Sequence, residues 1–347
     1  MTISLSDTKR ALASDVSTAV MAARRIVLTS HVNPDGDGLG SEAGLAHLLS
    51  GLGKEVAVAN PTPTPSRFSF LFAAMPGLDQ TKEAVRAIRR ADLIIVLDIA
   101  DLSRLGHLGD AVRTRNVPVM CIDHHASPGS LPDGPRYVDA SAAATGELVY
   151  EIAVANGWKV DVATARALYV ALLTDTGGFR FSNTHPRTLR IAADLLETGI
   201  DPESIYLQVY ASAPEGRPRL LADTLQTLVV EPEHGLAWVT VPPGAIERYG
   251  LTPDDLEGVV EYPRTIAGVR MAVLFRELSA GRIKVSLRSV GDVDVAGFAH
   301  ALGGGGHAKA AGVAIEGSMA QVQEQILEAA RDYLATLGGV GSGVGGR

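Results

Sequence analysis

Cysteine is almost absent from the sequence: Cys121 is the single one among 347 residues. No disulfide can therefore form within the chain, and we expect a protein of the reducing cytoplasm. The sequence has no run of about 18 apolar residues, which excludes a membrane-spanning helix. The charged residues among the first 25 leave no apolar stretch of the kind that a signal peptide needs.

Positive charge is in short supply as well. The chain has 31 Lys and Arg against 39 Asp and Glu, which gives a net charge of −8. It therefore lacks the overall positive field that holds a long nucleic-acid duplex. Any nucleic-acid partner is expected to be small or gripped locally.

The signature motifs of several enzyme classes are missing. No Cys-x-x-Cys pair and no His-Glu-x-x-His segment is present, which excludes zinc fingers and zincin proteases. Neither a Gly-x-Ser-x-Gly turn nor a G-x-x-x-x-G-K-[ST] loop occurs, which excludes the corresponding serine hydrolases and the P-loop nucleotide-binding proteins.

The length of the chain predicts about two domains, at roughly 150 residues per domain. From residue 25 to about residue 175, short apolar runs alternate with longer amphipathic stretches, which is typical of α/β proteins with a mainly parallel sheet and helices on both faces. The predicted strands are residues 26–30, 55–58, 93–97 and 117–122. The predicted helices are residues 39–53, 81–90, 145–156, 162–173 and 188–198.

A second, smaller domain is predicted beyond residue 222. Residues 211–219 are rich in Pro, Gly and charge, and we expect a linker over residues 211–222. The runs 236–241, 269–275 and 282–290 then alternate between apolar and polar residues, which predicts an α+β domain with a mixed sheet. The predicted domains are residues 10–210 and 223–337, and residues 338–347 form a glycine-rich flexible tail.

The first predicted strand leads into a turn with the sequence His31-Val-Asn-Pro-Asp35-Gly-Asp37-Gly-Leu-Gly-Ser41. Its glycines follow the spacing G-x-G-x-G, which differs from the G-x-G-x-x-G spacing of dinucleotide-binding proteins. Asp35 and Asp37 would also repel a pyrophosphate. Both features argue against a nicotinamide-dependent oxidoreductase, and phosphate would need intervening cations to bind here.

More polar residues follow later strands and helices: Asp98, the triplet Asp123-His124-His125, and Asp175. Any one of these aspartates alone is as well explained by a helix cap. The carboxyl ends of parallel strands meet at one rim, however, and carboxylates crowded there repel one another unless protons or metal ions neutralise them. Two divalent ions would balance four aspartates, and mixed His and Asp ligands favour manganese over magnesium. A pair of such ions suits phosphoester hydrolysis.

The second domain holds a local excess of positive charge. Residues 262–310 contain seven Lys or Arg and three acidic residues, a local charge of +4. Alternation along residues 282–290 predicts one apolar face and one face that carries Arg282, Lys284, Ser286 and Arg288. Such a face suits a small anionic substrate, although a solvated strand face is the alternative.

A run of four glycines, Gly303–Gly306, precedes His307. Without Cβ atoms, backbone N–H groups at Gly304, Gly305 and Gly306 can approach a phosphate closely, and His307 can add a hydrogen bond. Four glycines alone are also typical of a flexible turn. Their position beside Arg288 favours a phosphate site.

These motifs, in this order, resemble those of the DHH phosphoesterase superfamily, which is named for the Asp-His-His triplet found here at residues 123–125. The blocks Ser286-x-Arg288-Ser289 and Gly303-Gly-Gly-Gly306-His307-x-x-Ala310-Ala-Gly312 resemble the substrate-binding DHHA1 domain. The similarity spans roughly residues 10–335. It implies a two-domain hydrolase that holds its substrate in a cleft between the domains.

The resemblance also implies roles for individual residues. Two Mn²⁺ ions per subunit are expected, with Mg²⁺ or Co²⁺ as substitutes and a hydroxide between the two ions as the nucleophile. In the family pattern His31 and Asp35 bind one ion, Asp37, His124 and Asp175 bind the other, and Asp98 bridges both. Asp123 orients an imidazole, His125 lies near the phosphate, and Arg264 matches a substrate-binding arginine.

Within the superfamily, the second domain discriminates between relatives. Manganese pyrophosphatases lack the Gly-Gly-Gly-His run, RecJ-type exonucleases are longer, and cyclic-dinucleotide phosphodiesterases of this class carry membrane and sensor segments. The chain resembles the stand-alone nano-RNase type, which implies hydrolysis of oligoribonucleotides of about 2–5 residues or of 3'-phosphoadenosine 5'-phosphate. A linear or cyclic dinucleotide phosphodiesterase and a non-catalytic nucleotide sensor are the alternatives. The sequence leaves open the preferred substrate, the polarity of attack, the metal and the oligomeric state, and a homodimer is an expectation from the family alone.

Overall fold

A computed structural model of the protein describes residues 4–99, 101–125, 134–211, 213–256 and 258–338. The chain divides into two compact units, Met1–Ser212 and Ala213–Arg347. Each unit has its own sheet and its own apolar cores.

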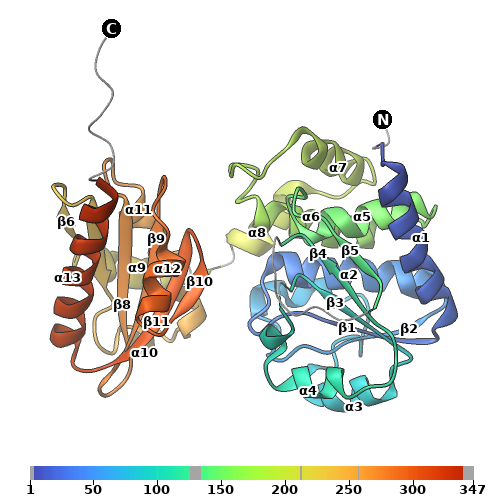
Figure 1. The fold of residues 1–347 in the computed structure, drawn as a ribbon, viewed down its shortest axis with the longest axis horizontal. Coiled ribbons are helices and arrows are strands. Elements are labelled where there is room, and N and C mark those ends of the chain that lie inside the picture. Colours follow the sequence, from blue (N-terminus) through green and yellow to red (C-terminus); the bar gives the residue numbers. More distant parts are fainter. Residues whose placement is uncertain (1–3, 100, 126–133, 212, 257, 339–347) are drawn as a thin grey trace, which may run out of the picture. The chain divides into compact units, whose positions relative to one another are not determined.

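Five parallel strands form the sheet of the first unit, in the order β2-β1-β3-β4-β5 (Figure 1). Their bounds are Arg25–Thr29 for β1, Glu55–Val58 for β2, Leu93–Leu97 for β3, Val119–Asp123 for β4 and Arg136–Val138 for β5. The residues of β3 are all buried, as expected for a strand that helices cover on both faces. The predicted parallel α/β architecture is confirmed.

Side chains of this sheet alternate between two cores. Ile26 and Leu28 of β1 belong to the larger core, whereas Val27 between them belongs to a second core on the opposite face. The larger core includes residues of α1 (Asp7–Ala22), α2 (Gly36–Gly51), α5 (Thr145–Ala155), α6 (Val162–Asp175), α7 (Pro186–Leu196) and α8 (Pro202–Tyr210). The second core includes residues of α3 (Ala84–Arg90), α4 (Gly109–Arg113) and a 3₁₀ segment, Leu102–Leu108. Figure 1 shows α3 and α4 together on one side of the sheet.

The second unit has a six-stranded sheet in the order β10-β11-β9-β8-β7-β6. The strands are β6 (Val229–Glu231), β7 (Leu236–Thr240), β8 (Met271–Ser279), β9 (Arg282–Ser289), β10 (Gly305–His307) and β11 (Ala310–Glu316). Only β7 and β8 run parallel among the pairs of this sheet that the structure describes, so the predicted mixed sheet is confirmed.

Helices cover both faces of the second sheet as well. Residues of α12 (Val295–Ala301) and α13 (Met319–Gly338) pack in one core. Residues of α9 (Gly216–Leu225) and α10 (Ala245–Arg248) pack in the other core, and α11 (Glu261–Arg264) lies against β7 and β8. Ile283, Val285 and Leu287 of β9 are buried in the first of these cores, as the alternation predicts.

Three segments differ from the sequence pattern or extend beyond it. Helix α1 is a helix that the strand and helix patterns do not predict, and three of its apolar residues are buried. Residues 211–222, the expected linker, contain most of α9, in which Pro218 lies in the first turn, where a missing N–H removes no helical hydrogen bond. Of the predicted tail, Gly338 is the last residue of α13, and residues 339–347 lie outside the described residues. None of the described helices is both long and apolar enough for a membrane span.

Candidate active site

The predicted metal ligands of the first unit lie at the carboxyl ends of its strands. His31 follows β1, Asp98 follows β3 directly, and Asp123 is the last residue of β4. Asp175 ends α6, which is the helix packed most extensively on α2. Residues from four separate parts of the chain therefore meet at one edge of the sheet, which is where open parallel sheets bind ligands.

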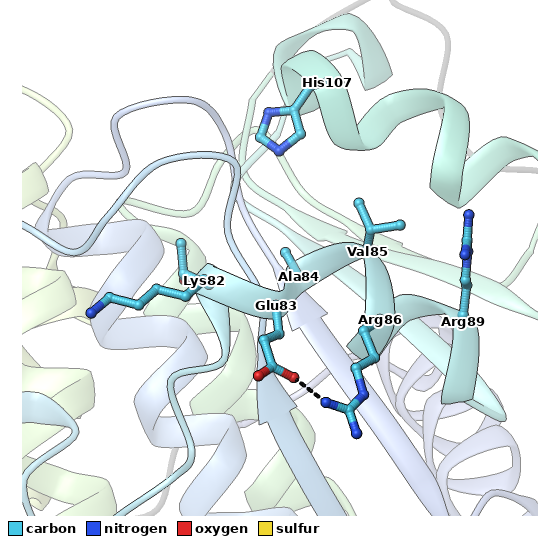
Figure 2. Close-up of a pocket in the computed structure, with 8 residues that line it drawn as sticks. Lys82, Glu83, Ala84, Val85, Arg86, Arg89 and His107 are labelled. Carbon is cyan, nitrogen blue, oxygen red and sulfur yellow. Dashed lines mark hydrogen bonds and ion pairs between the residues drawn. The ribbon is translucent and has the colours of Figure 1, made fainter.

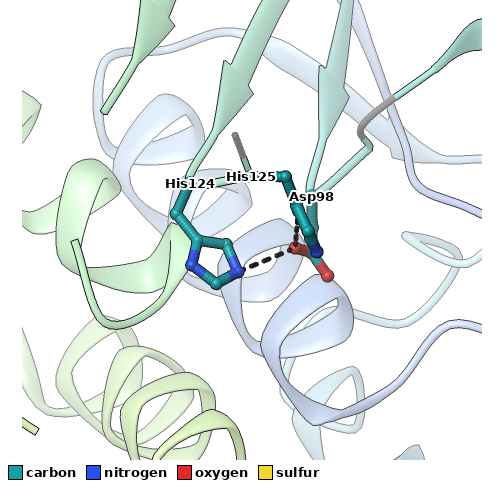
Figure 3. A group of neighbouring side chains, drawn as sticks. All are labelled: Asp98, His124 and His125. Atoms are coloured by element: carbon teal, nitrogen blue, oxygen red, sulfur yellow. Dashed lines mark ion pairs between the residues drawn. The ribbon is translucent and has the colours of Figure 1, made fainter. Parts of the chain in front are cut away.

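The ligand atoms fall into overlapping groups. One group is His31, Asp35 and Asp98, and another is Asp37, His124 and Asp175, and in each the candidate ligand atoms lie within 4.8 Å of one another. Asp98 also groups with His124 and His125, and Figure 3 shows both imidazoles directed at its carboxylate. The first two groups match the division of ligands that the resemblance implies.

Asp98 lies between the two groups. Nε2 of His31 is 3.6 Å from Oδ2 of Asp98, and Nε2 of His124 is 3.6 Å from Oδ1 of the same carboxylate. The His124 Nε2 atom also lies 3.6 Å from Oδ2 of Asp37 and 3.6 Å from Oδ2 of Asp175. The Nε2 atoms of His31 and His124 thus lie on the two oxygens of the Asp98 carboxylate at distances longer than direct hydrogen bonds.

The backbone sets the tautomer of both imidazoles. Nδ1 of His31 lies 2.9 Å from the carbonyl oxygen of Val32, and Nδ1 of His124 lies 3.3 Å from that of Ala142. A carbonyl oxygen only accepts hydrogen bonds, so each Nδ1 carries the proton. Each Nε2 is therefore the ring nitrogen that faces the neighbouring carboxylates and is placed to bind a metal ion.

Two helix N-termini hold the carboxylates of the first turn. Asp35 is the N-cap of α2 and accepts hydrogen bonds from the N–H groups of Asp37 and Gly38. Asp37 accepts from the N–H groups of Thr145 and Gly146 at the start of α5, at 2.6 Å and 3.0 Å. The positive ends of both helix dipoles thus face acidic side chains.

The glycines of this turn allow α2 to approach its neighbours. A Cβ on Gly36 would lie 2.4 Å from the side chain of Thr174, and one on Gly40 would lie 2.6 Å from the carbonyl oxygen of Ala167. Both neighbours belong to α6. The G-x-G-x-G spacing therefore serves the contact between two helices, one of which carries Asp37 and the other Asp175.

The electrostatics of the cluster favour a bound cation. Within the described part of the chain, no Lys or Arg forms an ion pair with Asp35, Asp37, Asp98 or Asp175. Burial, together with the charge of Asp98, raises the pKa of Asp37 well above its usual range. Burial likewise raises the pKa of Asp175 to about 6. Burial opposes ionisation of Asp98 too, but His31, His125 and His124 outweigh it and lower the pKa of Asp98 to about 2.

His125 forms a pair with Asp123. Its Nδ1 lies 2.7 Å from Oδ1 of the completely buried Asp123 carboxylate. Burial opposes protonation of His125, but the hydrogen bond to Asp123 and the charge of Asp98 outweigh it, so the pKa of His125 is raised. The imidazole therefore stays protonated to a higher pH than an ordinary histidine, as a proton donor to a leaving group requires.

The donor set fits divalent cations. It offers imidazole Nε2 atoms, carboxylates that no Lys or Arg of the described residues pairs with, and Asp98, which belongs to the group of His31 and Asp35 and lies 3.6 Å from His124 of the other group. Carboxylate oxygens and imidazole nitrogens together are typical ligands of divalent metal ions. The residues can therefore hold such ions.

In the second unit, sheet register aligns the predicted substrate-binding residues. Arg288 of β9 pairs with Ala310 of β11, which pairs with His307 of β10, and Ser286 is aligned in the same way with Gly312 and Gly305. Residues directly opposite one another share a face of the sheet. The β11 residues between them are Ala310 and Gly312, so no large side chain separates the β9 residues from the glycine-rich strand β10.

Gly304, which precedes β10, and Gly305 and Gly306 of β10 differ in what they do for the fold. A Cβ on Gly304 would lie 2.3 Å from the carbonyl oxygen of Gly312, and one on Gly306 would lie 2.5 Å from that of Ala310. A Cβ on Gly305 would meet nothing within 4 Å. Packing of the sheet therefore requires glycine at positions 304 and 306, whereas the absence of a side chain at Gly305 leaves surface open to a ligand.

One residue outside the predicted set links the two predicted arginines. Oε1 of Glu261 accepts from Nε of Arg288 at 2.7 Å, and Oε2 accepts from Nε of Arg264 at 2.5 Å. Glu261 thus aligns two guanidinium groups that come from α11 and β9. It lies 27 residues from Arg288, and no periodic pattern in the sequence indicates this contact.

A separate cavity lies by α3 (Figure 2) and has a volume of about 390 Å³. Lys82, Arg86, Arg89 and His107 line it together with Glu83, which pairs with Arg86. None of the predicted metal ligands lines this cavity. His107, which lines it, is not among the metal ligands that the sequence predicts.

Comparison with known proteins matches both halves of the chain. Residues 25–172 match the DHH family, N-terminal domain, and residues 238–336 match the DHHA1 domain. The chain is 33% identical over 321 residues to the bifunctional oligoribonuclease and PAP phosphatase NrnA of Thermus thermophilus, and the match covers 90% of this chain and 91% of that protein.

Solved structures share the fold. An exopolyphosphatase-related protein from Bacteroides fragilis matches with a TM-score of 0.89 at 29% identity, covering 94% of this chain and 98% of that one. RecJ from Thermus thermophilus, solved in complex with Mn²⁺, matches with a TM-score of 0.55 at 16% identity, covering 96% of this chain and 56% of that one. The second likeness concerns the fold alone.

Proposed function

The chain belongs to the DHH/DHHA1 phosphoesterase family, and from this premise we propose that it hydrolyses very short oligoribonucleotides, of about 2–5 nucleotides, to mononucleotides and 3'-phosphoadenosine 5'-phosphate to AMP. The similarity to a bifunctional oligoribonuclease and PAP phosphatase over nine-tenths of the chain supports this choice. The reaction depends on divalent ions, of which Mn²⁺ is the proposed one.

The observation that carries the proposal is the position of Asp98. Its carboxylate belongs to the group with His31 and Asp35 and to the group with His124 and His125, and His124 is also a member of the group with Asp37 and Asp175. A shared carboxylate is what two adjacent cations require, since it offsets charge on both. Two divalent ions held there would lower the pKa of water and offset the charge that develops on phosphorus.

The proposed roles follow from the contacts. His31, Asp35 and Asp98 would hold one ion, and Asp37, His124, Asp175 and Asp98 would hold the other. His125, oriented and kept protonated by Asp123 at 2.7 Å, donates a proton to the leaving oxygen.

The second unit binds the phosphate end of the substrate in this proposal. Arg288 and Arg264, aligned by Glu261, supply positive charge, and the register aligns Gly305 with Ser286 and the backbone of His307 with Arg288. Gly304 and Gly306 allow the glycine-rich segment to pack on its neighbour, and His307 is proposed to add a hydrogen bond to the phosphate. Guanidinium groups bind phosphate through charge-assisted hydrogen bonds. One such phosphate-binding surface suits a substrate of a few nucleotides rather than a polymer, and the net charge of −8 agrees with a small substrate.

The test is the initial rate of hydrolysis of pApA, 3'-phosphoadenosine 5'-phosphate, cyclic di-AMP and pyrophosphate, with Mn²⁺ and with an excess of chelator. We expect mononucleotide release from the first two substrates and its loss on chelation. The Asp98→Asn protein, purified in parallel, controls for contaminating nucleases. Cleavage of pyrophosphate alone, or of cyclic di-AMP alone, would replace the proposed substrate class, and rates unaffected by chelator would exclude the metal centre.

A further inference from the structure

A short segment, residues 142–146, comprises the three residues before α5 and the first two residues of that helix, and is called the 142–146 loop. It contacts two of the three residues of the Asp37, His124 and Asp175 group. The carbonyl oxygen of Ala142 lies 3.3 Å from Nδ1 of His124. The N–H groups of Thr145 and Gly146 donate to the two carboxylate oxygens of Asp37, at 2.6 Å and 3.0 Å. The 142–146 loop therefore fixes the ring of His124 and the carboxylate of Asp37 together.

Asn183 connects the third member of the group to this loop. Its Nδ2 donates to the carbonyl oxygen of Ala143 at 3.1 Å and to the carbonyl oxygen of Asp175 at 3.1 Å. Two carbonyl acceptors can be joined only by a group with two donors, and a side-chain amide has two N–H bonds. On the other side of the loop, the N–H of Ala143 donates to Oε2 of Glu147 at 3.2 Å.

The other group of ligands is held by different contacts. His31 is oriented by the carbonyl oxygen of Val32, and Asp35 by the N–H groups of its own helix. Among the hydrogen bonds of the described residues, the 142–146 loop reaches this group through the hydroxyl of Thr145, which lies 3.2 Å from Oδ1 of Asp98. A change at Asn183 thus acts on one group and leaves the other group's contacts in place.

We propose that Asn183 is a positioning residue that sets the affinity of one metal site, formed by Asp37, His124 and Asp175, and not that of the other. It does so by tying the backbone of Asp175 to the loop that orients His124 and Asp37. The inference rests on the proposed function, because it assumes two divalent ions in this cluster. Residues that orient metal ligands typically contribute about 10–100-fold to metal affinity.

The experiment compares Mn²⁺ binding to the full-length metal-free protein and to Asn183→Leu, by calorimetric titration and by the electron paramagnetic resonance signal of coupled Mn²⁺ pairs. Leucine has a similar size and lacks both donors. We expect one of two binding steps to weaken by about tenfold or more, with loss of the coupled-pair signal, while the other step keeps its affinity. Asn183→Ala is expected to give the same selective change if leucine disturbs folding.

The exposed neighbour provides a matched control, since Ser182→Ala should leave both steps unchanged. Far-ultraviolet circular dichroism and the melting temperature of the metal-free proteins confirm that each variant is folded. Equal weakening of both steps would assign Asn183 a general structural role and overturn the proposal, as would unchanged binding. Failure of the wild-type protein to bind two ions would instead overturn the proposed metal centre itself.

Discussion

Asp98 combines an unusual backbone conformation with a carboxylate at the centre of the candidate metal cluster. Its backbone has a φ of 56°, in the left-handed region that Asn and Asp tolerate better than most other side chains. Its carboxylate is buried and approached by His31, His124 and His125, and it accepts a hydrogen bond from Thr145. Asparagine therefore keeps the backbone conformation and removes only the charge, whereas alanine also strains the turn.

Asp98→Asn should abolish turnover while leaving the protein folded. The expected loss in kcat exceeds about 100-fold, the upper end of what residues that only orient ligands contribute, because a carboxylate shared by two ions is lost. The check is the rate on 3'-phosphoadenosine 5'-phosphate over a range of Mn²⁺ concentrations. Asp110→Asn, an exposed acid on α4, is the control, and near-normal turnover by Asp98→Asn would contradict the shared-ligand role.

Arg288→Gln should raise KM for nucleotide substrates more than it lowers kcat. A charge-assisted hydrogen bond is worth about 1.5–3 kcal/mol, which corresponds to a change of about 10–100-fold. Arg282→Gln on the exposed end of the same strand has the same change of charge and should leave KM within about twofold. Steady-state kinetics of the two variants decide the matter, and equal effects would indicate a diffuse electrostatic field instead of a specific contact.

At the scale of elements, three helix ends determine the charge state of the metal cluster. The N-termini of α2 and α5 donate backbone N–H groups to Asp35 and Asp37, which offsets part of their charge. Asp175 is instead the last residue of α6, where the negative end of the helix dipole disfavours a carboxylate. Without a bound metal ion, the ionised form of Asp175, which predominates above its pKa, is therefore unfavourable in the folded protein.

The metal-free protein should therefore lose stability as the pH rises from 5 to 7. A carboxylate whose pKa is raised to about 6 in the folded state contributes stability at low pH, and that contribution is lost as the pH rises through this value. Asp175→Asn should reduce the difference in melting temperature between pH 5 and pH 7, and Mn²⁺ should restore the stability of the wild-type protein at pH 7. Melting curves with chelator test this, and a wild-type melting temperature that rises over this interval would contradict it.

The two glycines of β10, Gly305 and Gly306, should separate folding from binding. Gly306→Ala is expected to lower the melting temperature, because its Cβ would lie 2.5 Å from a backbone oxygen. Gly305→Ala should leave the melting temperature unchanged and raise KM, since its Cβ points into open space that the proposed substrate uses. Parallel melting and kinetic measurements distinguish the two effects, and a Gly305→Ala protein with normal KM would remove this position from the binding surface.

Much of the element order is predictable because buried parallel strands read as continuous apolar runs, as 93–97 does. The three-residue strand β5 and helix α1 have weaker signals, since β5 is short and only three apolar residues of α1 are fully buried. Helix α9 is hidden by Gly216 and Pro218, which also suit a linker. Polar contacts such as those of Asn183 and Glu261 join residues far apart in sequence and leave no period to detect.

For the whole molecule, the separation of the cores has a consequence for folding. The apolar clusters of residues 1–212 and of residues 213–347 share no residue. A unit with its own core is expected to fold on its own.

The fragment of residues 1–212 should therefore unfold cooperatively and bind Mn²⁺, while its hydrolysis of 3'-phosphoadenosine 5'-phosphate is reduced because the arginines of the second unit are missing. Circular dichroism, metal titration and kinetics on the fragment provide the three measurements, with the full chain as the control. Wild-type kcat/KM in the fragment would show that the second unit does not bind this substrate.

Cys121 of β4 has no exposed surface, and burial raises the pKa of its thiol to about 12. Thiol-directed dyes react with the thiolate, so the native protein should be nearly inert to them. Because the sequence has no other cysteine, one introduced on the surface of each unit would accept a fluorophore selectively. The protein is thus ready for single-molecule energy-transfer measurements of its two units during turnover, with its own cysteine left in place.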